Sequence, residues 1–363
     1  MEGVSRHFGA HAAVDNVSFE LRQGEVLTLL GPSGCGKTTT LRMAIGLEHV
    51  SHGRVLYGSR VLDAPAERVF VSPEDRDMGM VFQSYAIWPH MSVFENVAFP
   101  LCTRGEKKAE IDRKVSEILA QVGLAGFETR SGMQLSGGQQ QRVAVARGLV
   151  GNPDVLLMDE PFSNLDAKLR DRLRTELRVL QRRLNISILF VTHDQTEALA
   201  LSDRIAVMRD GRIEQIGPPM ELYTQPATPF VRDFLGQSVL IRARIVESGA
   251  DGTRVRLGDG THLSARGRNH LSVTAAETQC LLSVRPEEIR IVPAAQDTGA
   301  ANVVTGTIRH LLFLGQFYEA TIDLPRGQEA LMHLGREIDW HEGQEVHLHL
   351  PAEHLQIWDR QSG

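Results

Sequence analysis

The sequence has little of what marks secreted, disulfide-linked or metal-clustering chains. Its 363 residues contain only 3 cysteines, Cys35, Cys102 and Cys280, which lie far apart and in no metal-ligand spacing. An odd number at such spacing argues against a disulfide framework and against a zinc site. The cysteine content therefore favours a reducing compartment.

Long hydrophobic runs and dense basic runs are also missing. The longest apolar stretches, such as 26–30, are far shorter than the roughly 20 residues that cross a bilayer, and the N-terminus lacks the pattern of a signal peptide. Lys plus Arg number 39 against 45 Asp plus Glu, which gives a net charge of −6. We therefore expect no nucleic-acid partner, and any association with a membrane is expected to come through another protein.

What is present fits a folded chain with two domains. Hydrophobic residues make up 42% and charged residues 23%, as in globular proteins, and the length exceeds the roughly 100 to 200 residues of one domain. The continuous apolar run 26–30 is typical of a central parallel strand, and 155–158 and 187–191 indicate further buried strands. The sequence thus predicts an α/β domain over residues 1–236.

Two further regions differ from this core. Between about 91 and 150 the pattern is helical, and 107–122 places five apolar residues on one helix face, which indicates a helical insert. After Gly236, short alternating segments such as 253–257 are separated by glycine and aspartate. These segments predict a small all-β domain over residues 237–363.

A glycine-rich loop follows the first buried run. Its pattern G-x-x-x-x-G-K-[ST] lets backbone N–H groups turn inward around phosphates, while Lys37 neutralises phosphate oxygens and Thr38 can bind Mg²⁺. Residues 37–45 after the loop have helical composition, and the helix that starts near Gly36 adds its positive dipole end. We also expect Cys35 to be partly exposed and, with Lys37 nearby, sensitive to thiol alkylation. The predicted nucleotide-binding residues of the loop are Gly31, Pro32, Ser33, Gly34, Cys35, Gly36, Lys37, Thr38 and Thr39.

Two carboxylates end the buried run 155–158. In an open α/β sheet the ligand lies at the carboxyl ends of the strands, so Asp159 is predicted to hold Mg²⁺ and Glu160 to polarise the attacking water. Taken alone, an acidic pair here is as often the start of a loop. The phosphate loop upstream favours the catalytic interpretation.

A second glycine turn lies at the start of another predicted helix. Its N–H groups and the Ser136 hydroxyl are suited to grip a phosphate, although alone they form an ordinary helix cap. One nucleotide needs only one phosphate loop, so a second points to a site shared between two copies. The turn consists of Leu135, Ser136, Gly137, Gly138 and Gln139.

Together these motifs resemble the ATP-binding cassette of ABC transporters, over roughly residues 4–235. The resemblance implies that Gln83 senses Mg²⁺ and the attacking water, that Asp166 lies in a loop between subunits, and that His193 contacts the γ-phosphate. It also implies that Phe8 stacks on adenine, with an ordinary core or surface phenylalanine as the alternative. Family members usually carry a strand before this position, so here the strand is expected to be shortened or the start assigned late.

The resemblance also implies partners. Two copies would sandwich ATP head to tail, and separate permease subunits would dock between core and helical insert, near 85–90. Core packing is the alternative for Ile87 and Trp88. A periplasmic solute-binding protein would act indirectly, and the chain would lie on the cytoplasmic face of the inner membrane.

Residues from about 237 resemble the small OB-like TOBE domain of importers, most clearly at 283–289. Such a domain either binds a ligand or supports the dimer. The segment 81–97 resembles the polyamine and ferric-iron branch, with a sugar or glycerol-phosphate importer as the alternative. A non-transport ATPase is a remote alternative, because a coiled-coil insertion and a second cassette are both absent from the sequence.

Overall fold

The structure is a computed structural model that describes residues 1–271, 275–292 and 301–360. The chain folds into two compact units, Met1–Thr224 and Gln225–Gly363. This division falls before residue 236 because Arg232 packs within the second unit, with its guanidinium 5.0 Å from the ring centre of Trp358. The domain bounds 1–236 and 237–363 stay a prediction.

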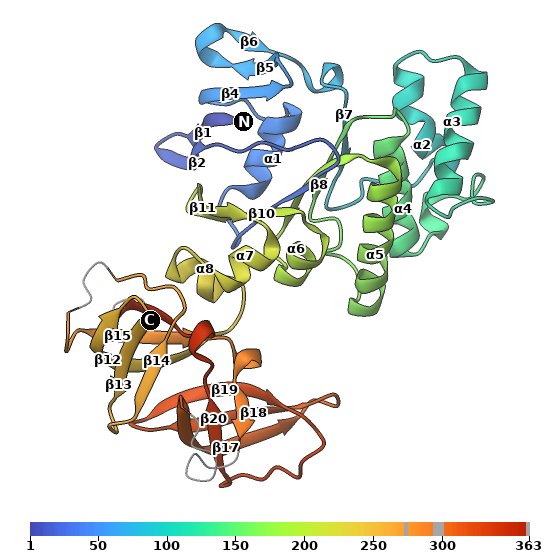
Figure 1. Ribbon diagram of the computed structural model, residues 1–363. Helices are drawn as coiled ribbons and strands as arrows, with labels where there is room; N and C mark the ends of the chain where they lie inside the picture. The colour runs from blue at the N-terminus through green and yellow to red at the C-terminus, as the bar shows by residue number, and fades with distance from the viewer. Residues whose placement is uncertain (272–274, 293–300, 361–363) are drawn as a thin grey trace. The chain divides into compact units, whose positions relative to one another are not determined.

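The first unit is built around a six-stranded sheet in the order β11-β10-β3-β9-β8-β7 (Figure 1). Strands β10, β3, β9, β8 and β7 are parallel, and β11 is antiparallel to β10. Helix α1 packs against β8 and β9, while α6 packs against β3. Both β3 and β9 are buried along their whole length, as continuous apolar runs require. The strands are β3 (Val26–Leu30), β7 (Met78–Val81), β8 (Val155–Asp159), β9 (Ser187–Thr192), β10 (Arg204–Arg209) and β11 (Arg212–Gly217).

An antiparallel sheet in the order β2-β1-β4-β5-β6 completes the β structure of this unit. Its first strand already contains Phe8 and spans seven residues, so the segment expected to be shortened forms a full strand. The strands are β1 (Glu2–Phe8), β2 (His11–Val17), β4 (His52–Tyr57), β5 (Arg60–Ala64) and β6 (Val69–Phe70).

Three of the helices fall within residues 91–150. Helix α2 begins at a capping box in which Ser92 and Glu95 bind each other's backbone N–H, and α3 buries one apolar face. Within the described residues, no helix is long and apolar enough to cross a membrane. The helices are α1 (Lys37–Ile45), α2 (Val93–Thr103), α3 (Lys108–Gln121), α4 (Gly137–Leu149), α5 (Ala167–Leu184), α6 (Gln195–Leu201) and α7 (Pro219–Thr224).

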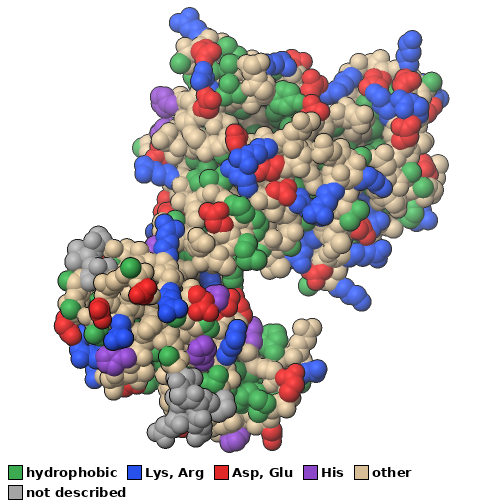
Figure 2. All heavy atoms as spheres, viewed as in Figure 1, with side chains coloured by type: hydrophobic (Ala, Val, Ile, Leu, Met, Phe, Trp, Pro, Cys, Tyr) green, Lys and Arg blue, Asp and Glu red, His purple; other side chains and the backbone are tan. Residues whose placement is uncertain are grey.

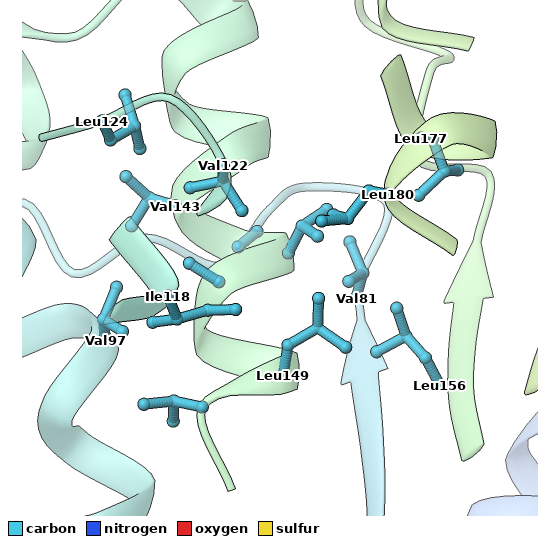
Figure 3. Close-up of a cluster of buried hydrophobic side chains, with 14 of the residues drawn as sticks. Val81, Val97, Ile118, Val122, Leu124, Val143, Leu149, Leu156, Leu177 and Leu180 are labelled. Carbon is cyan, nitrogen blue, oxygen red and sulfur yellow. The ribbon is translucent and has the colours of Figure 1, made fainter. Parts of the chain in front are cut away.

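A hydrophobic cluster joins α2, α3, α4 and α5 to the strands β7 and β8. In Figure 3 its side chains, among them Ile118, Val143, Leu149 and Leu156, converge from these elements. Each fully buried valine, leucine or isoleucine contributes about 1.5 to 3 kcal/mol. The cluster therefore fixes the position of α4, whose first turn carries the second glycine motif.

Over its described residues, the second unit is β structure with one short α-helix, α8 (Pro229–Phe234), and two 3-10 turns, Pro286–Glu288 and Ala352–His354. It contains two five-stranded sheets, β14-β13-β12-β15-β21 and β16-β20-β17-β18-β19, with every pair antiparallel. Along β13, buried Thr253, Val255 and Leu257 alternate with exposed arginines. The strands are β12 (Val239–Gly249), β13 (Gly252–Leu257), β14 (His262–Ala265), β15 (Gln279–Val284), β16 (Arg290–Val292), β17 (Val303–Phe313), β18 (Tyr318–Leu324), β19 (Gln328–Leu334), β20 (Glu345–His349) and β21 (Gln356–Asp359).

The expected fold class, an α/β core with a helical region followed by an all-β unit, is confirmed by this architecture. Helix α1 and strand β3 occupy the residues from which they were predicted. On the face shown in Figure 2, basic and acidic side chains are interspersed over each unit.

One histidine couples the stability of the second unit to pH. The His270 ring stacks on Trp358 with centroids 3.6 Å apart. Burial, together with the charges of Arg268 and Arg232, lowers the pKa of His270 to about 4. An unfolded histidine takes up its proton near pH 6.5. Between about pH 6.5 and 4 the unfolded state therefore binds the extra proton, and stability falls as the pH falls.

We predict that His270→Phe, which keeps a stacking ring without a titrating group, flattens this pH dependence. Thermal unfolding of the second unit at pH 7.5 and pH 5 measures it. The control is His262→Phe on an exposed position of β14, which should retain the wild-type slope. An equal loss of stability in wild type and His270→Phe would contradict the prediction.

Candidate nucleotide-binding site

The phosphate loop lies between the carboxyl end of β3 and the first turn of α1. Gly36 has φ +101°, and a Cβ there would lie 2.4 Å from the carbonyl oxygen of Ala13. At Gly31 a Cβ would lie 2.3 Å from the Met208 carbonyl oxygen. Gly36, the cap of α1, makes no side-chain hydrogen bond to that helix, so the first N–H groups remain available to an anion.

The ammonium group of Lys37 lies inside this loop. It donates to the carbonyl oxygens of Gly31 at 2.7 Å and Pro32 at 2.9 Å. The residue is only 5% exposed. The loop carbonyls thus hold a buried positive charge where phosphate oxygens are predicted to bind.

Oxygen donors from two elements meet beside the loop. The Thr38 hydroxyl, at the start of α1, donates to Asp159 Oδ1 at the end of β8, 2.9 Å away. Burial raises the pKa of Asp159, and the Thr38 hydrogen bond opposes that shift. One hydroxyl and one buried carboxylate suit Mg²⁺, which binds few protein ligands together with phosphates and water. Within the described residues, no cluster of three or more His, Cys, Asp or Glu offers an all-protein metal cage.

The carboxylate of Glu160 lies between two predicted site residues. Gln83 Nε2 donates to Glu160 Oε2 at 3.1 Å, and His193 Nδ1 lies 3.2 Å from Glu160 Oε1. The Glu160 side chain is 19% exposed and that of His193 is 56% exposed. Residues 83, 160 and 193 thus form one group of contacting side chains. Gln83 binds the carboxylate of Glu160 rather than that of Asp159.

Side chains that no sequence motif identifies support this group. Arg170 of α5 donates to Asp194 Oδ2 at 3.2 Å and to the Leu165 carbonyl oxygen at 3.1 Å. The Thr192 hydroxyl binds Glu197 at 2.6 Å, and burial raises the pKa of Glu197. The two neighbours of His193 are therefore fixed. Nothing in the local sequence around Arg170 signals these contacts.

The loop after Gln83 is fixed in a similar way. Asn164 Nδ2 donates to the Gln83 carbonyl oxygen at 3.1 Å. Tyr85 and Ala86 both have positive φ, +59° and +47°, and Arg147 of α4 donates to both of their carbonyl oxygens at 2.7 Å. Positive φ is uncommon for residues other than glycine, so the Arg147 contacts stabilise a strained turn.

The second glycine motif caps α4. Ser136 Oγ accepts from the Gln139 N–H, and Gln139 Oε1 accepts from the Ser136 N–H. Ser136 and Gly137 are exposed, whereas Gly138 packs against Leu169 of α5. Within the described residues no hydrogen bond links residues 135–139 to the phosphate loop. Their predicted phosphate contact, made to another copy, stays a prediction.

Asp166 and Phe8 lie at the margins of the site. Asp166 Oδ1 accepts from the Leu169 N–H at 3.0 Å and caps α5. The Phe8 ring is 47% exposed, and the Arg6 guanidinium lies 4.7 Å from its centre. Their predicted roles between subunits and under adenine stay predictions. The ring of Phe8 is exposed enough to stack on a base.

The expected exposure of Cys35 is wrong. The residue is only 3% exposed, because its side chain packs under the loop close to Gly31 and Lys37. Burial raises the pKa of its thiol more than the charge of Lys37 lowers it. Since the thiolate is the reactive form, a buried thiol reacts slowly.

We therefore predict that N-ethylmaleimide labels Cys102, which is exposed, well before Cys35 or Cys280. Burial raises the pKa of Cys280 to about 11. Peptide mass spectrometry of the native chain over time measures the order, and urea should release the two slow sites. A Cys102→Ser chain should take up almost no label while folded. Equal rates at Cys35 and Cys102 would refute the prediction.

The geometry defines a nucleotide-binding protein with a phosphate loop, a paired carboxylate and a second glycine-capped helix. Comparison with known families agrees with this class. The ABC transporter family model matches residues 14–163, and the TOBE domain model matches residues 282–358. By these matches and by the relatives that follow, the chain belongs to the ATP-binding proteins of ABC transporters.

Two relatives illustrate its place in the family. "Fe(3+) ions import ATP-binding protein FbpC" of Agrobacterium fabrum is 47% identical over 326 residues, covering 90% of this chain and 88% of the relative. "Spermidine/putrescine import ATP-binding protein PotA" of Rubrobacter xylanophilus is 42% identical over 333 residues, covering 92% and 85%. The predicted resemblance to this importer group is thus confirmed.

Solved structures of ABC transporter proteins match part of the chain. CbiO1 of Clostridium perfringens, part of the ABC transporter complex cbiONQ, gives a TM-score of 0.55 at 29% identity, covering 61% of this chain and 88% of that one. A dimeric bacterial ABC transporter cassette gives 0.52 at 30% identity, covering 60% of this chain and 97% of that one.

Proposed function

We propose that the chain hydrolyses ATP and couples hydrolysis to solute import through separate permease subunits. The observation that carries the proposal is the Glu160 carboxylate, held between Gln83 and His193 directly after Asp159. A carboxylate in that position can accept a proton from water at the phosphate end of a nucleotide. The import relatives support the coupling to transport.

The chemistry is the transfer of the γ-phosphoryl group to water. Glu160 orients the water, whose oxygen bonds to the γ-phosphorus as the bond from phosphorus to the β–γ bridging oxygen breaks and ADP leaves. Lys37 and the loop N–H groups stabilise the negative charge on the phosphates, and His193 lies beside Glu160 to contact the γ-phosphate. Mg²⁺ held by Thr38 and Asp159 would neutralise phosphate charge. Gln83 connects the water-binding carboxylate to the loop at 84–90.

The second half of each site would come from another copy. The glycine motif at the N-terminus of α4 faces solvent at Ser136 and Gly137, and the related cassette structure is dimeric. A two-fold, head-to-tail pair would place each glycine motif against the partner's phosphate loop. ATP then holds the two copies together, and hydrolysis releases them.

We predict that Glu160→Gln lowers the ATP turnover rate at least about 100-fold, because a general base is lost. ATP binding should remain. Phosphate release measures the first effect. Equilibrium binding and size-exclusion chromatography with ATP measure the second, and a stable ATP-bound dimer is expected. Glu74→Gln, at an exposed glutamate, is the matched control. Wild-type turnover in Glu160→Gln would refute the assignment.

A groove in the first unit supports the permease as partner. A cavity of about 360 Å³ is lined by Phe82, Trp88, Pro100 and Arg147, among others. The Trp88 ring lies 4.5 Å from Phe99 and 4.7 Å from the Arg147 guanidinium. Arg147 also holds the turn after Gln83. A displacement of Trp88 on docking would therefore move this turn and, through Gln83, change the contact with Glu160. A permease helix docked here would place the chain on the cytoplasmic face of the inner membrane.

We predict that Trp88→Ala reduces co-purification with the cognate permease subunits, because it removes the aromatic wall of the groove. ATP binding by the isolated chain should change less than about threefold. Phe70→Ala removes a different exposed aromatic side chain and should leave co-purification intact. Equal recovery of the permease with Trp88→Ala and wild type would contradict this docking site.

The proposed cargo is ferric iron or a polyamine, since import relatives with both names match over about nine tenths of the chain. A sugar or glycerol-phosphate importer is the alternative. Uptake of radiolabelled ferric iron and of putrescine by a strain deleted for this gene distinguishes them. A deletion strain that imports both normally and loses sugar uptake favours the alternative. A periplasmic binding protein would deliver the cargo.

A further inference from the structure

A basic cavity in the second unit takes no part in ATP hydrolysis. It has a volume of about 670 Å³ and lies among β12, β13, β15, the turn before β19 and the residue after β21. Among the residues that the structure describes, Asp259 is the single carboxylate of its lining. The lining includes five arginines, Arg242, Arg244, Arg256, Arg326 and Arg360.

The sheet places two of these arginines directly opposite each other. Arg244 of β12 pairs in register with Arg256 of β13, an arrangement of like charges that costs stability. The Glu277 carboxylate bridges them, 3.4 Å from Arg244 and 2.8 Å from Arg256. One carboxylate thus compensates two guanidinium groups.

The other three arginines have less compensation. Within the described residues, Arg242, Arg326 and Arg360 form no ion pair with a carboxylate. Arg360 donates to the neutral amide of Gln279. The cavity therefore carries an excess of positive charge, which an anion would neutralise.

A glycine sets the position of one of these groups. At Gly258, in the turn after β13, an added Cβ would lie 2.5 Å from Arg326 Cδ and 2.7 Å from its Nε. The Arg326 side chain therefore lies directly over this turn. The φ of Gly258 is not positive, so a residue with a Cβ would meet no backbone strain there. The glycine matters because its missing side chain leaves space for Arg326.

We propose that this cavity binds a small polyanion that carries at least two carboxylate or phosphate groups. Guanidinium groups match both oxyanions in geometry and charge. The volume falls in the range of sites for small ligands, about 300 to 1,000 Å³, and exceeds what a single phosphate or sulfate ion fills. A polyamine is positively charged, as the cavity is, and is therefore repelled.

The test uses the full chain free of nucleotide and Mg²⁺, because ADP itself carries two phosphate groups and would occupy the proposed site, and because Mg²⁺ binds citrate and pyrophosphate. Isothermal titration with citrate and, separately, with pyrophosphate asks which oxyanion binds. Putrescine, which is positively charged, serves as the control that should not bind. Saturable binding of citrate or pyrophosphate, weakened by added salt, supports the proposal and identifies the class. Saturable binding of neither anion overturns it.

Charge removal locates the site. The double variant Arg242→Gln/Arg326→Gln should weaken anion binding at least about tenfold, since each charged hydrogen bond is worth more than a neutral one. Arg290→Gln, at an exposed arginine on the other sheet, should change affinity less than about twofold. Unchanged affinity in the double variant overturns the proposal.

A second pair of variants tests geometry at constant charge. Gly258→Ala displaces the Arg326 side chain without removing a charge and should weaken binding about threefold or more. Gly249→Ala, where a Cβ meets nothing within 4 Å, is its control and should bind as wild type does. Thermal unfolding confirms that each variant is folded. Because ATPase activity is not the readout, these results are independent of the proposed hydrolysis.

Discussion

The register of three parallel strands determines where the chemistry of this protein lies. Leu30 of β3 pairs with Thr192 of β9, and Asp159 of β8 pairs with Val191. All three strands therefore end at one edge of the sheet, where the phosphate loop, the acidic pair and His193 follow them. A shift of one residue in this register would turn the buried side chains to the other face. The hydrophobic core thus determines, to within one residue, where each strand ends and where the site residues follow it.

Strained backbone segments at this edge are held by hydrogen bonds from other elements. Glu160 has φ +43°, and its N–H donates to the Val191 carbonyl oxygen at 2.9 Å. Tyr85 and Ala86 are held by Arg147. Conformations of this kind cost about 1 to 3 kcal/mol each and persist only where neighbours fix them. The fixed backbone orients Glu160, and the arginine links that backbone to the groove around Trp88.

The parts of the site that follow from local sequence could be predicted. The phosphate loop, the helix over Lys37–Ile45 and the strand ending at Asp159 each depend on a short pattern of glycines or apolar residues. The burial of Cys35 could not, because it depends on a loop that closes against Met208, far away in sequence. The contacts of Arg170 and Arg147 likewise join separate elements, and no periodicity indicates which distant partner an arginine will meet.

The charge of the arginine cavity likewise could not be predicted from the sequence. A net charge of −6 argues against a nucleic-acid partner, because such a partner needs basic charge over a wide surface. At physiological salt, however, exposed charges act over about 8 Å, so the residues around one cavity decide its potential. Arg242, Arg256 and Arg326 come from segments separated by up to 84 residues in sequence, and folding of the β unit brings them together. Composition describes the whole chain, whereas binding depends on this local arrangement.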